Sequence, residues 1–152
     1  MPPVPRDPDF EARVRASFAR QGVMTTCGAR LASVVPGEVV LEVDFRDDLT
    51  QQHGFLHAGV IASVADSACG YAALTLMEPG SAVLSVEFKV NLLAPAAGTT
   101  FRAVGKVVRA GRTLTVCTAE VRARGADGVE SAPIAVMQAT MMTLKDRPEL
   151  VD

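Results

Sequence analysis

The sequence has no tryptophan, a single tyrosine and only two histidines among its 152 residues. Proteins that bind single-stranded nucleic acids stack bases on aromatic side chains, and this chain offers few of them. Positive charge is also scarce, because 15 Lys and Arg residues are set against 17 Asp and Glu residues, for a net charge of −2. A nucleic acid or an anionic membrane surface favours a basic partner. We therefore expect neither among its partners.

Cysteine is sparse as well. Cys27, Cys69 and Cys117 are an odd number, lie in apolar sequence and lack the paired spacing of a disulfide framework or a zinc site. With only His53 and His57 beside them, a zinc site would need an unusual mixed set of ligands. We interpret the cysteines as reduced core thiols, which are typical of the cytoplasm, and we expect no metal or other cofactor.

Targeting and membrane signals are missing too. The N-terminus, MPPVPRDPDF, lacks the basic stretch and apolar run of a secretory signal. The longest apolar segment, Gly54–Met77, carries Asp66 near its centre, where lipid burial would cost about 2.5–3.5 kcal/mol. We therefore expect a buried helix in a cytoplasmic protein rather than a membrane span.

The chain length fits one domain with a substantial core. Residues 1–8 are rich in proline and are expected to be flexible, and residues 9–152 to form a single domain. A short helix is predicted over 9–20, with Asp9 as its cap. Two strands follow between about Met24 and Phe45, separated by a turn at 35–37, and a polar loop leads to a long helix over about 57–77.

Four further strands are predicted after the long helix, at about 84–92, 101–108, 113–124 and 134–144. The long helix has apolar or small residues on every side, so it must be enclosed. The chain offers too few other helices to enclose it, so the sheet must curl around it. The pattern therefore predicts an α+β fold in which an antiparallel sheet of about six strands wraps one long central helix.

Asp66 is the outstanding residue of that helix. An ionised carboxylate among apolar side chains is unfavourable unless it is hydrogen-bonded, paired or solvated by a cleft. A purely structural Asp66 could be satisfied by Ser63, by Ser67 or by a backbone group across the fold. Lone charges in apolar elements nevertheless gather at functional sites, and partial desolvation would raise the pKa and make a better base or nucleophile. We favour the functional interpretation.

The start of the long helix has a second chemical feature. Gly54, His57, Ala58 and Gly59 place a permissive backbone where the first N–H groups have no helical partners. Those donors, together with the helix dipole, can hold an oxyanion. The alternative, non-functional interpretations are an ordinary glycine-rich start of a helix and a structural, hydrogen-bonded His57.

The spacing of these two features predicts a symmetric dimer. Ala58 and Asp66 lie eight residues apart, which is about 12 Å along a helix axis. An oxyanion donor and a base that act on one carbonyl must each lie about 3 Å from the reacting atoms. One subunit cannot satisfy both, so the two groups must come from two antiparallel helices.

The motif Gln51-x-x-Gly54-x-x-His57-Ala58-Gly59, with Asp66 after it, resembles the PaaI-type branch of the hotdog thioesterases. Ser85-Val86-Glu87-Phe88 and the segment Arg-Ala-Gly-Arg-Thr-Leu at 109–114 extend the resemblance over nearly all of residues 10–144. Members of this family have the hotdog fold and hydrolyse acyl-CoA or aryl-CoA thioesters. They do so as homodimers or homotetramers with each active site between subunits.

The resemblance implies a role for each matching residue. Asp66 would be the catalytic carboxylate, acting as general base or as nucleophile, and the Ala58 N–H would be the oxyanion donor. His57 would orient the loop or position the thioester, and Ser85 would hold the water or Asp66. Gln51 occupies the position at which the family has an Asn or Gln side chain in the active site.

The resemblance also implies where CoA binds. Arg109, Gly111 and Arg112 match the family's basic turn near the CoA phosphates, and Gly59 belongs to the substrate-contacting helix start. On residues alone, a solvated hairpin tip is an equally good interpretation of this turn.

Three departures from the family pattern leave the acyl group of the substrate open. Many PaaI-type members have Asn at the position of Gln51, whereas Gln is found in the 4-hydroxybenzoyl-CoA branch, whose helix carboxylate is Glu. Ala58 replaces the usual Gly, and Gly70 lacks the hydroxyl found in the second branch.

Two alternative functions stay open. A hotdog hydratase or dehydratase acting on acyl-CoA or acyl-carrier protein would need a catalytic histidine, for which His53 and His57 are the candidates. A non-catalytic acyl-CoA binding module would keep the fold and bind the ester without cleaving it. The motif spacing favours the thioesterase over the hydratase, and the substitution at Gln51 leaves room for the binding module.

Overall fold

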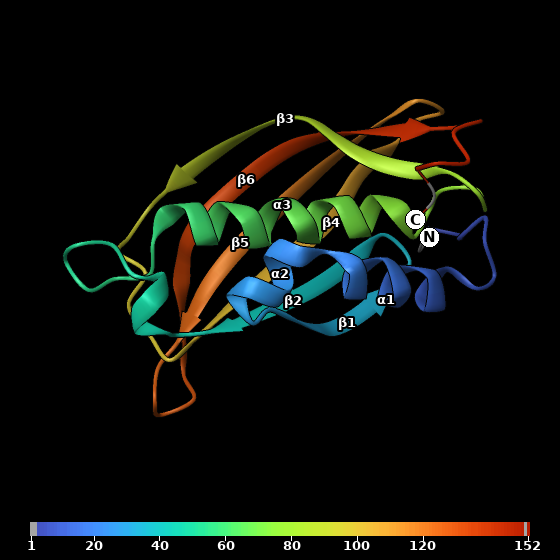
Figure 1. Cartoon of the computed structure of the whole chain (residues 1–152). Helices are drawn as coiled ribbons and strands as arrows, with labels where there is room; N and C mark the ends of the chain where they lie inside the picture. Colours follow the sequence, from blue (N-terminus) through green and yellow to red (C-terminus); the bar gives the residue numbers. More distant parts are fainter. Residues whose placement is uncertain (1–2, 151) are drawn as a thin grey trace.

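The computed structural model describes residues 3–150 and 152, and it consists of a long helix held in a curved sheet (Figure 1). Residues 1–2 of the segment expected to be flexible lie outside the described residues. The elements in chain order are α1 (Phe10–Arg20), α2 (Gly22–Cys27), β1 (Arg30–Val35), β2 (Glu38–Asp44), the short 3-10 helix η1 (Asp47–Leu49), α3 (Ala58–Leu74), β3 (Ala82–Leu92), β4 (Thr100–Ala110), β5 (Leu114–Arg124) and β6 (Glu130–Leu144).

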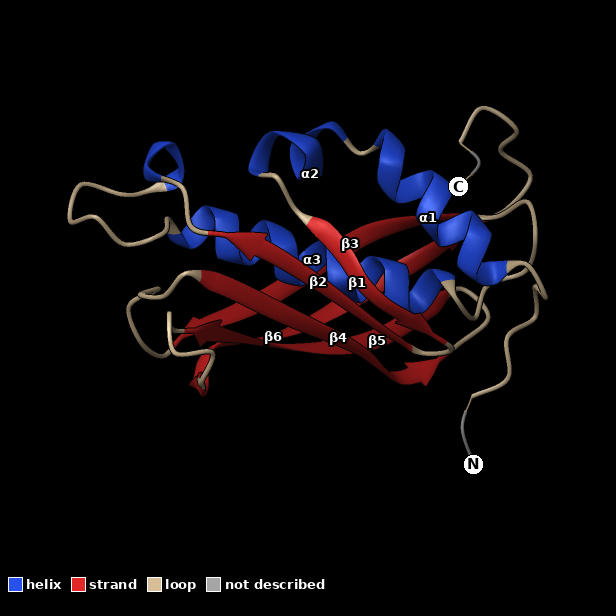
Figure 2. Ribbon diagram, turned by 90° about the horizontal axis from the view of Figure 1, so that it is seen from below, coloured by secondary structure: helices blue, strands red, loops and turns tan. Residues whose placement is uncertain are grey.

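The six strands form one antiparallel sheet in the order β1-β2-β4-β5-β6-β3. The sheet curls along α3 without closing, so β1 and β3 are its two edges (Figure 2). The predicted α+β hotdog architecture is therefore confirmed. The core lies between α3 and the concave face of the sheet, where the largest fully buried side chains include Leu41, Ile61, Leu74, Phe101 and Met141.

Close contact between α3 and β4 depends on a glycine. A Cβ added at Gly105 would lie 2.3 Å from the carbonyl carbon of Ala68, which is far inside normal contact distance. The Ala68 side chain is itself fully buried. Only a residue without a side chain therefore lets this strand approach the helix backbone so closely.

Gly105→Ala should destabilise the protein by about 1–3 kcal/mol, because the added methyl group meets backbone atoms that cannot rotate away. Thermal unfolding followed by circular dichroism should show a melting temperature lower by several degrees. Gly22→Ala is the matched control, since a Cβ at Gly22 meets nothing within 4 Å. A Gly105→Ala protein as stable as the control would contradict this account of the packing.

The N-terminal region differs from expectation in two respects. Residues 22–27 form helix α2, where the sequence predicts the start of a strand. The segment is rich in Val and Thr, which favours a strand, but Met24 and Cys27 lie three residues apart and both bury against the core. Gly28, with a φ of +69°, then ends the helix in the left-handed conformation.

The cap of α1 also differs. Asp9 occupies the N-cap position, but its side chain makes no capping hydrogen bond. The Asp9 N–H instead donates to Asp7 Oδ1 at 2.9 Å, and the largely buried Asp7 also pairs with Arg13. The acidic residue that organises this helix entry is therefore Asp7.

The last strand begins earlier than predicted, at Glu130. Pro133 lies within β6 rather than before it, at a place where the β5–β6 register shifts. A register shift tolerates a residue without an N–H donor, which explains how the strand includes proline.

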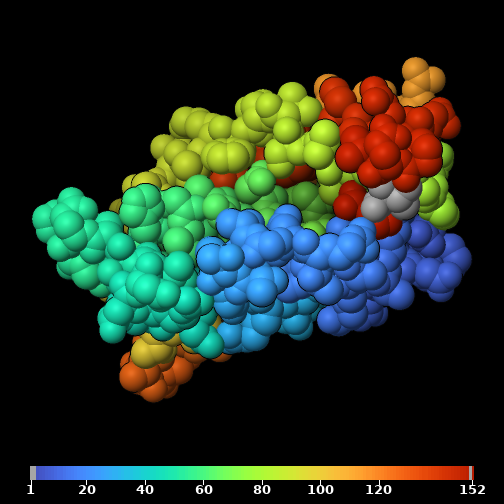
Figure 3. Space-filling model, in the orientation of Figure 1, coloured from blue at the N-terminus to red at the C-terminus, as the bar shows by residue number. Residues whose placement is uncertain are grey.

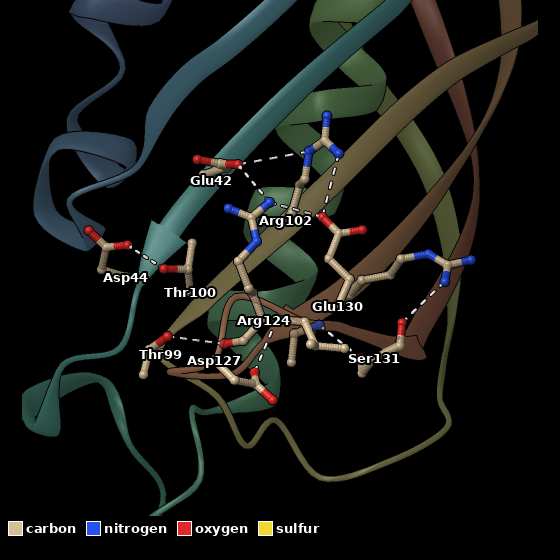
Figure 4. Close-up of polar contacts among 12 residues, drawn as sticks. Glu42, Asp44, Thr99, Thr100, Arg102, Arg124, Asp127, Glu130 and Ser131 are labelled. Atoms are coloured by element: carbon tan, nitrogen blue, oxygen red, sulfur yellow. Dashed lines mark hydrogen bonds and ion pairs between the residues drawn. The ribbon is translucent and has the colours of Figure 1, made fainter.

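The outer face of the sheet carries an ion-pair network centred on Glu42 (Figure 4). Glu42 pairs with Arg30, Arg102 and Arg124, and the last two arginines also pair with Glu130. These residues alternate along their strands with buried apolar ones, so they point away from α3. Asp44 also pairs with Arg30, so three arginines meet three carboxylates, and the network links the strands across the sheet.

Candidate active site

Asp66 is held by a neighbouring strand and not by its own helix. Ser85 of β3 donates a hydrogen bond from Oγ to Asp66 Oδ1 at 2.7 Å. Neither serine considered for a structural role bonds to Asp66: Ser63 donates to a backbone carbonyl one turn earlier, and Ser67 donates to Gln21. Asp66 Oδ2 has no hydrogen-bond partner among the residues that the structure describes.

The Asp66 carboxylate lines a small cavity of about 100 Å³ between α3, β3 and the α1–α2 junction. Partial burial raises the pKa of Asp66, and the Ser85 hydrogen bond opposes that shift. The group is thus a half-buried carboxylate with one oxygen anchored and the other open to the cavity. Such a carboxylate can accept a proton or act as a nucleophile.

The start of α3 leaves one backbone donor open. The Gly59 N–H donates to His57 Nδ1 at 2.8 Å, so the His57 side chain is the helix cap. The N–H groups of Val60 and Ile61 both donate to the His57 carbonyl. The Ala58 N–H is then the one donor of this first turn without an acceptor in residues 3–150 and 152.

Ala58 lines an apolar cavity of about 460 Å³ at the N-terminal end of α3. No lining side chain carries a formal charge, and the lining residues are Gln51, Phe55, Leu56, Ala58, Ile61, Leu92, Leu93, Ala94, Pro95, Ala96 and Ile134. The Gln51 side-chain oxygen accepts a hydrogen bond from the His53 N–H, so this amide is folded back onto its own loop. The size and lining of the cavity are those of a small-molecule site.

The two candidate catalytic groups lie in separate cavities. The cavity at Ala58 and the cavity at Asp66 share no lining residue, although both open along the same helix. Ala58 and Asp66 of a single chain therefore do not converge. Their separation follows from their spacing of eight residues, which corresponds to about 12 Å along the axis of α3.

The basic hairpin lies at the opposite end of α3. Gly111 and Arg112, between β4 and β5, line a cavity of about 170 Å³ together with Leu76 and Met77, which follow the end of α3. Its charged lining residues are Arg6, Glu78, Arg112 and Lys145. Arg109 is exposed and is not part of that lining. The structure thus groups Gly111 and Arg112 and separates both from Ala58.

Tight backbone geometry shapes this turn. The Gly111 N–H donates to the Leu114 carbonyl at 2.9 Å. A Cβ at Gly111 would approach that carbonyl oxygen to 2.4 Å, so the turn admits only glycine there.

The edge strand β3 exposes apolar side chains that the sequence does not mark as exposed. Phe88 and Leu92 are paired in register with the buried Ala139 and Ala135, so they face the α3 side of the sheet, yet they are 46% and 54% exposed. Figure 3 shows why: between β3 and the N-terminal helices the surface is hollowed, and α3 forms the floor. The cavity that contains Asp66 lies along this opening.

The cysteines are free and buried, as expected. Burial raises the pKa of the Cys117 thiol to about 12, and it also raises that of Cys69. Both thiols therefore stay protonated and are not nucleophiles. Within the described residues, no helix is long and apolar enough to cross a membrane.

A long helix inside an open antiparallel sheet, with a carboxylate on the helix and a free N–H at its start, defines the class of hotdog thioester hydrolases. The family model described as the thioesterase superfamily matches residues 53–129, which are 77 of the 152 residues. The chain belongs to this superfamily.

Known proteins agree with this assignment. A thioesterase family protein from Silicibacter pomeroyi is 55% identical, with a TM-score of 0.86 over 90% of this chain and 98% of that one. A 1,4-dihydroxy-2-naphthoyl-CoA hydrolase from Listeria monocytogenes is 27% identical over 62% of this chain and 77% of its own. The E. coli PaaI protein, from the phenylacetic acid degradation operon, shares the fold at 18% identity, with a TM-score of 0.78 over 90% of this chain and 94% of that one.

Proposed function

We propose that this thioester hydrolase cleaves an acyl-CoA or aryl-CoA thioester, with Asp66 of one subunit and the Ala58 N–H of another acting on one carbonyl. The observation that carries the proposal is that one helix bears two groups without a hydrogen-bond partner in the described part of the chain. Asp66 has one free oxygen in a small cavity, and Ala58 has a free N–H beside an apolar one. The similarity to a CoA hydrolase supports CoA as the thiol.

The site is completed by a second copy of the chain across the β3 edge. An edge strand presents unpaired N–H and C=O groups, and here it adds the exposed apolar side chains of Phe88 and Leu92. Two-fold symmetry makes the two α3 helices antiparallel, and Ala58 of each then lies beside Asp66 of the other. The small residues along the open side of α3, among them Gly59, Ser63 and Gly70, let the helices approach closely.

The bond-making and bond-breaking steps of the proposed reaction use these two groups. Water attacks the carbonyl carbon while Asp66 takes one of its protons, and the Ala58 N–H stabilises the oxyanion that forms. The C–S bond then breaks, the acid is released, and the CoA thiolate recovers the proton. In the nucleophilic variant, Asp66 attacks the carbonyl first, and water hydrolyses the resulting anhydride.

The two ends of the substrate go to two different surfaces. The apolar cavity beside Ala58 accepts the acyl or aryl group, since it carries no charge that would pair with a polar acid. In an antiparallel pair, the partner's β4–β5 hairpin lies beyond the Ala58 end of the helix. Its Arg112 is a donor for the CoA phosphates.

Release of free CoA from saturated acyl-CoA esters, measured with a thiol reagent, tests the activity. Thioester hydrolysis predicts turnover with such esters. A hydratase would leave them intact, because they have no double bond. A non-catalytic module would bind the ester tightly without producing thiol.

Arg112→Ala should raise KM several-fold for CoA thioesters but leave KM unchanged for N-acetylcysteamine thioesters, which lack the phosphates. Parallel kinetics with both substrate types measure the difference. Arg15→Ala, which removes an exposed arginine from α1, is the control. An equal effect of Arg112→Ala on both substrates would remove the phosphate contact from the proposal.

Ser85→Ala should move the acidic limb of the kcat pH profile to higher pH. The Ser85 hydroxyl lowers the pKa of Asp66, so its loss lets burial raise that pKa further. Asp66 must be ionised to act, so activity at a given acidic pH falls. Stopped assays across pH measure the limb, and an unmoved limb would show that Ser85 does not tune the catalytic carboxylate.

A further inference from the structure

The junction between α1 and α2 brings a glutamine into the Asp66 cavity. Gln21 ends one helix and begins the next, with an extended backbone at φ −80° and ψ 98°. Its carbonyl accepts the N–H groups of Met24 and Thr25, and its own N–H donates to Phe18. These three hydrogen bonds fix the Gln21 backbone. The sequence predicts the end of the first helix at residue 20, but not helix α2, whose first turn fixes the Gln21 carbonyl.

The side chain of Gln21 is anchored at one end only. Ser67 of α3, which is 7% exposed, donates from Oγ to Gln21 Oε1 at 3.0 Å. This hydrogen bond uses the amide oxygen, so Nε2 is the end of the Gln21 side chain that Ser67 leaves free. Nε2 has no acceptor in the described part of the chain.

Gln21 and Asp66 line the same cavity of about 100 Å³. A volume of this size holds more than one water molecule, and a bound water needs two to four polar partners. The cavity offers Asp66 Oδ2 as an acceptor and Gln21 Nε2 as a donor, since Ser85 already gives its proton to Asp66. An amide donor and a free carboxylate oxygen that belong to the lining of one cavity are two partners that can orient a water for attack.

We propose that Gln21 is a positioning residue that holds the hydrolytic water beside Asp66, with Ser67 fixing its amide. The inference rests on the proposed function of Asp66 and adds the water's second partner. Nε2–H donates to the water oxygen, and the water donates one proton to Asp66 Oδ2. The second lone pair of the oxygen stays free to attack the carbonyl carbon.

Three substitutions test this role with one acyl-CoA ester. Gln21→Ala should lower kcat about 10- to 100-fold with KM nearly unchanged, because the water is lost and not the substrate. Ser67→Ala should give a smaller loss of the same kind, since Gln21 keeps its amide but not its orientation. Gln138→Ala removes an exposed glutamine from β6 and should behave as wild type.

The pH profile of a Gln21→Glu variant distinguishes a positioning role of Gln21 from a purely structural one. A carboxylate at this place opposes ionisation of Asp66, so the acidic limb of the pH profile should shift to higher pH. The groups facing Asp66 from the surrounding elements are Cys69 and Tyr71 of α3, Ser85 of β3, Met141 of β6 and Asp152, with Arg20 in the adjoining cavity. None of them changes in this variant.

The outcomes separate this inference from the proposed function. An inactive Asp66→Asn protein together with a Gln21→Ala protein of wild-type kcat would overturn the role of Gln21 alone. A fully active Asp66→Asn protein would overturn the function on which it rests. If Gln21→Ala lowers kcat but Gln21→Glu leaves the acidic limb in place, Gln21 does not act beside Asp66, and the inference is also lost.

Discussion

Asp66→Asn should lower kcat by a factor of about 10²–10⁴, the range typical of losing a general base. Asparagine keeps the size of the side chain and can still accept the Ser85 hydrogen bond, but it cannot take a proton from water or attack a carbonyl. KM should change little, because neither the apolar cavity nor the hairpin is altered. Steady-state kinetics with a saturated acyl-CoA measure both constants.

The same variant should be more stable than wild type at neutral pH. Burial raises the pKa of Asp66, so the folded protein disfavours the ionised form, and the wild type loses stability as the pH rises through that raised pKa. Asparagine removes this penalty, and the difference in melting temperature should shrink as the pH is lowered. Asp9→Asn, at an exposed aspartate without a side-chain cap, is the matched control. A folded Asp66→Asn protein with full activity would exclude Asp66 from catalysis.

Local pattern was enough to predict most of the fold. The sheet strands follow from period-two alternation, and the long helix follows from a continuous run of apolar and small residues. The prediction that Asp66 is functional follows from a single charge in such a run. Each of these features lies in contiguous sequence, and a short segment is therefore sufficient to detect it.

The features that sequence analysis missed depend on segments distant in the chain. Phe88 and Leu92 look like core residues in their own strand, and they are exposed only because β3 lies at the sheet edge. Helix α2 opposes its own strand propensity because Met24 and Cys27 bury against the core. No feature of the neighbouring sequence distinguishes Gln21. Its place beside Asp66 follows from the junction between α1 and α2 and from Ser67, 46 residues away.

Ala58→Pro should remove the proposed oxyanion donor while preserving the helix. Ala58 is the first residue of α3, where the φ of proline fits and its missing N–H breaks no helical bond. His57, with a ψ of 137°, already has the extended conformation required before proline. Loss of one such donor typically lowers kcat about 10²–10³-fold. Ala58→Gly keeps the N–H and should retain most of the activity.

A mixed dimer of the two inactive variants should recover activity. If each site takes its N–H from one subunit and its carboxylate from the other, a dimer of one Ala58→Pro chain and one Asp66→Asn chain contains one doubly altered site and one intact site. Purified through two different tags, it should show about half of the wild-type turnover per dimer. A site built within a single subunit would leave both sites of the mixed dimer damaged, and activity would stay at the level of the parents. Because each variant has lost most of its activity by itself, the recovered turnover must come from groups that two subunits bring together in one site.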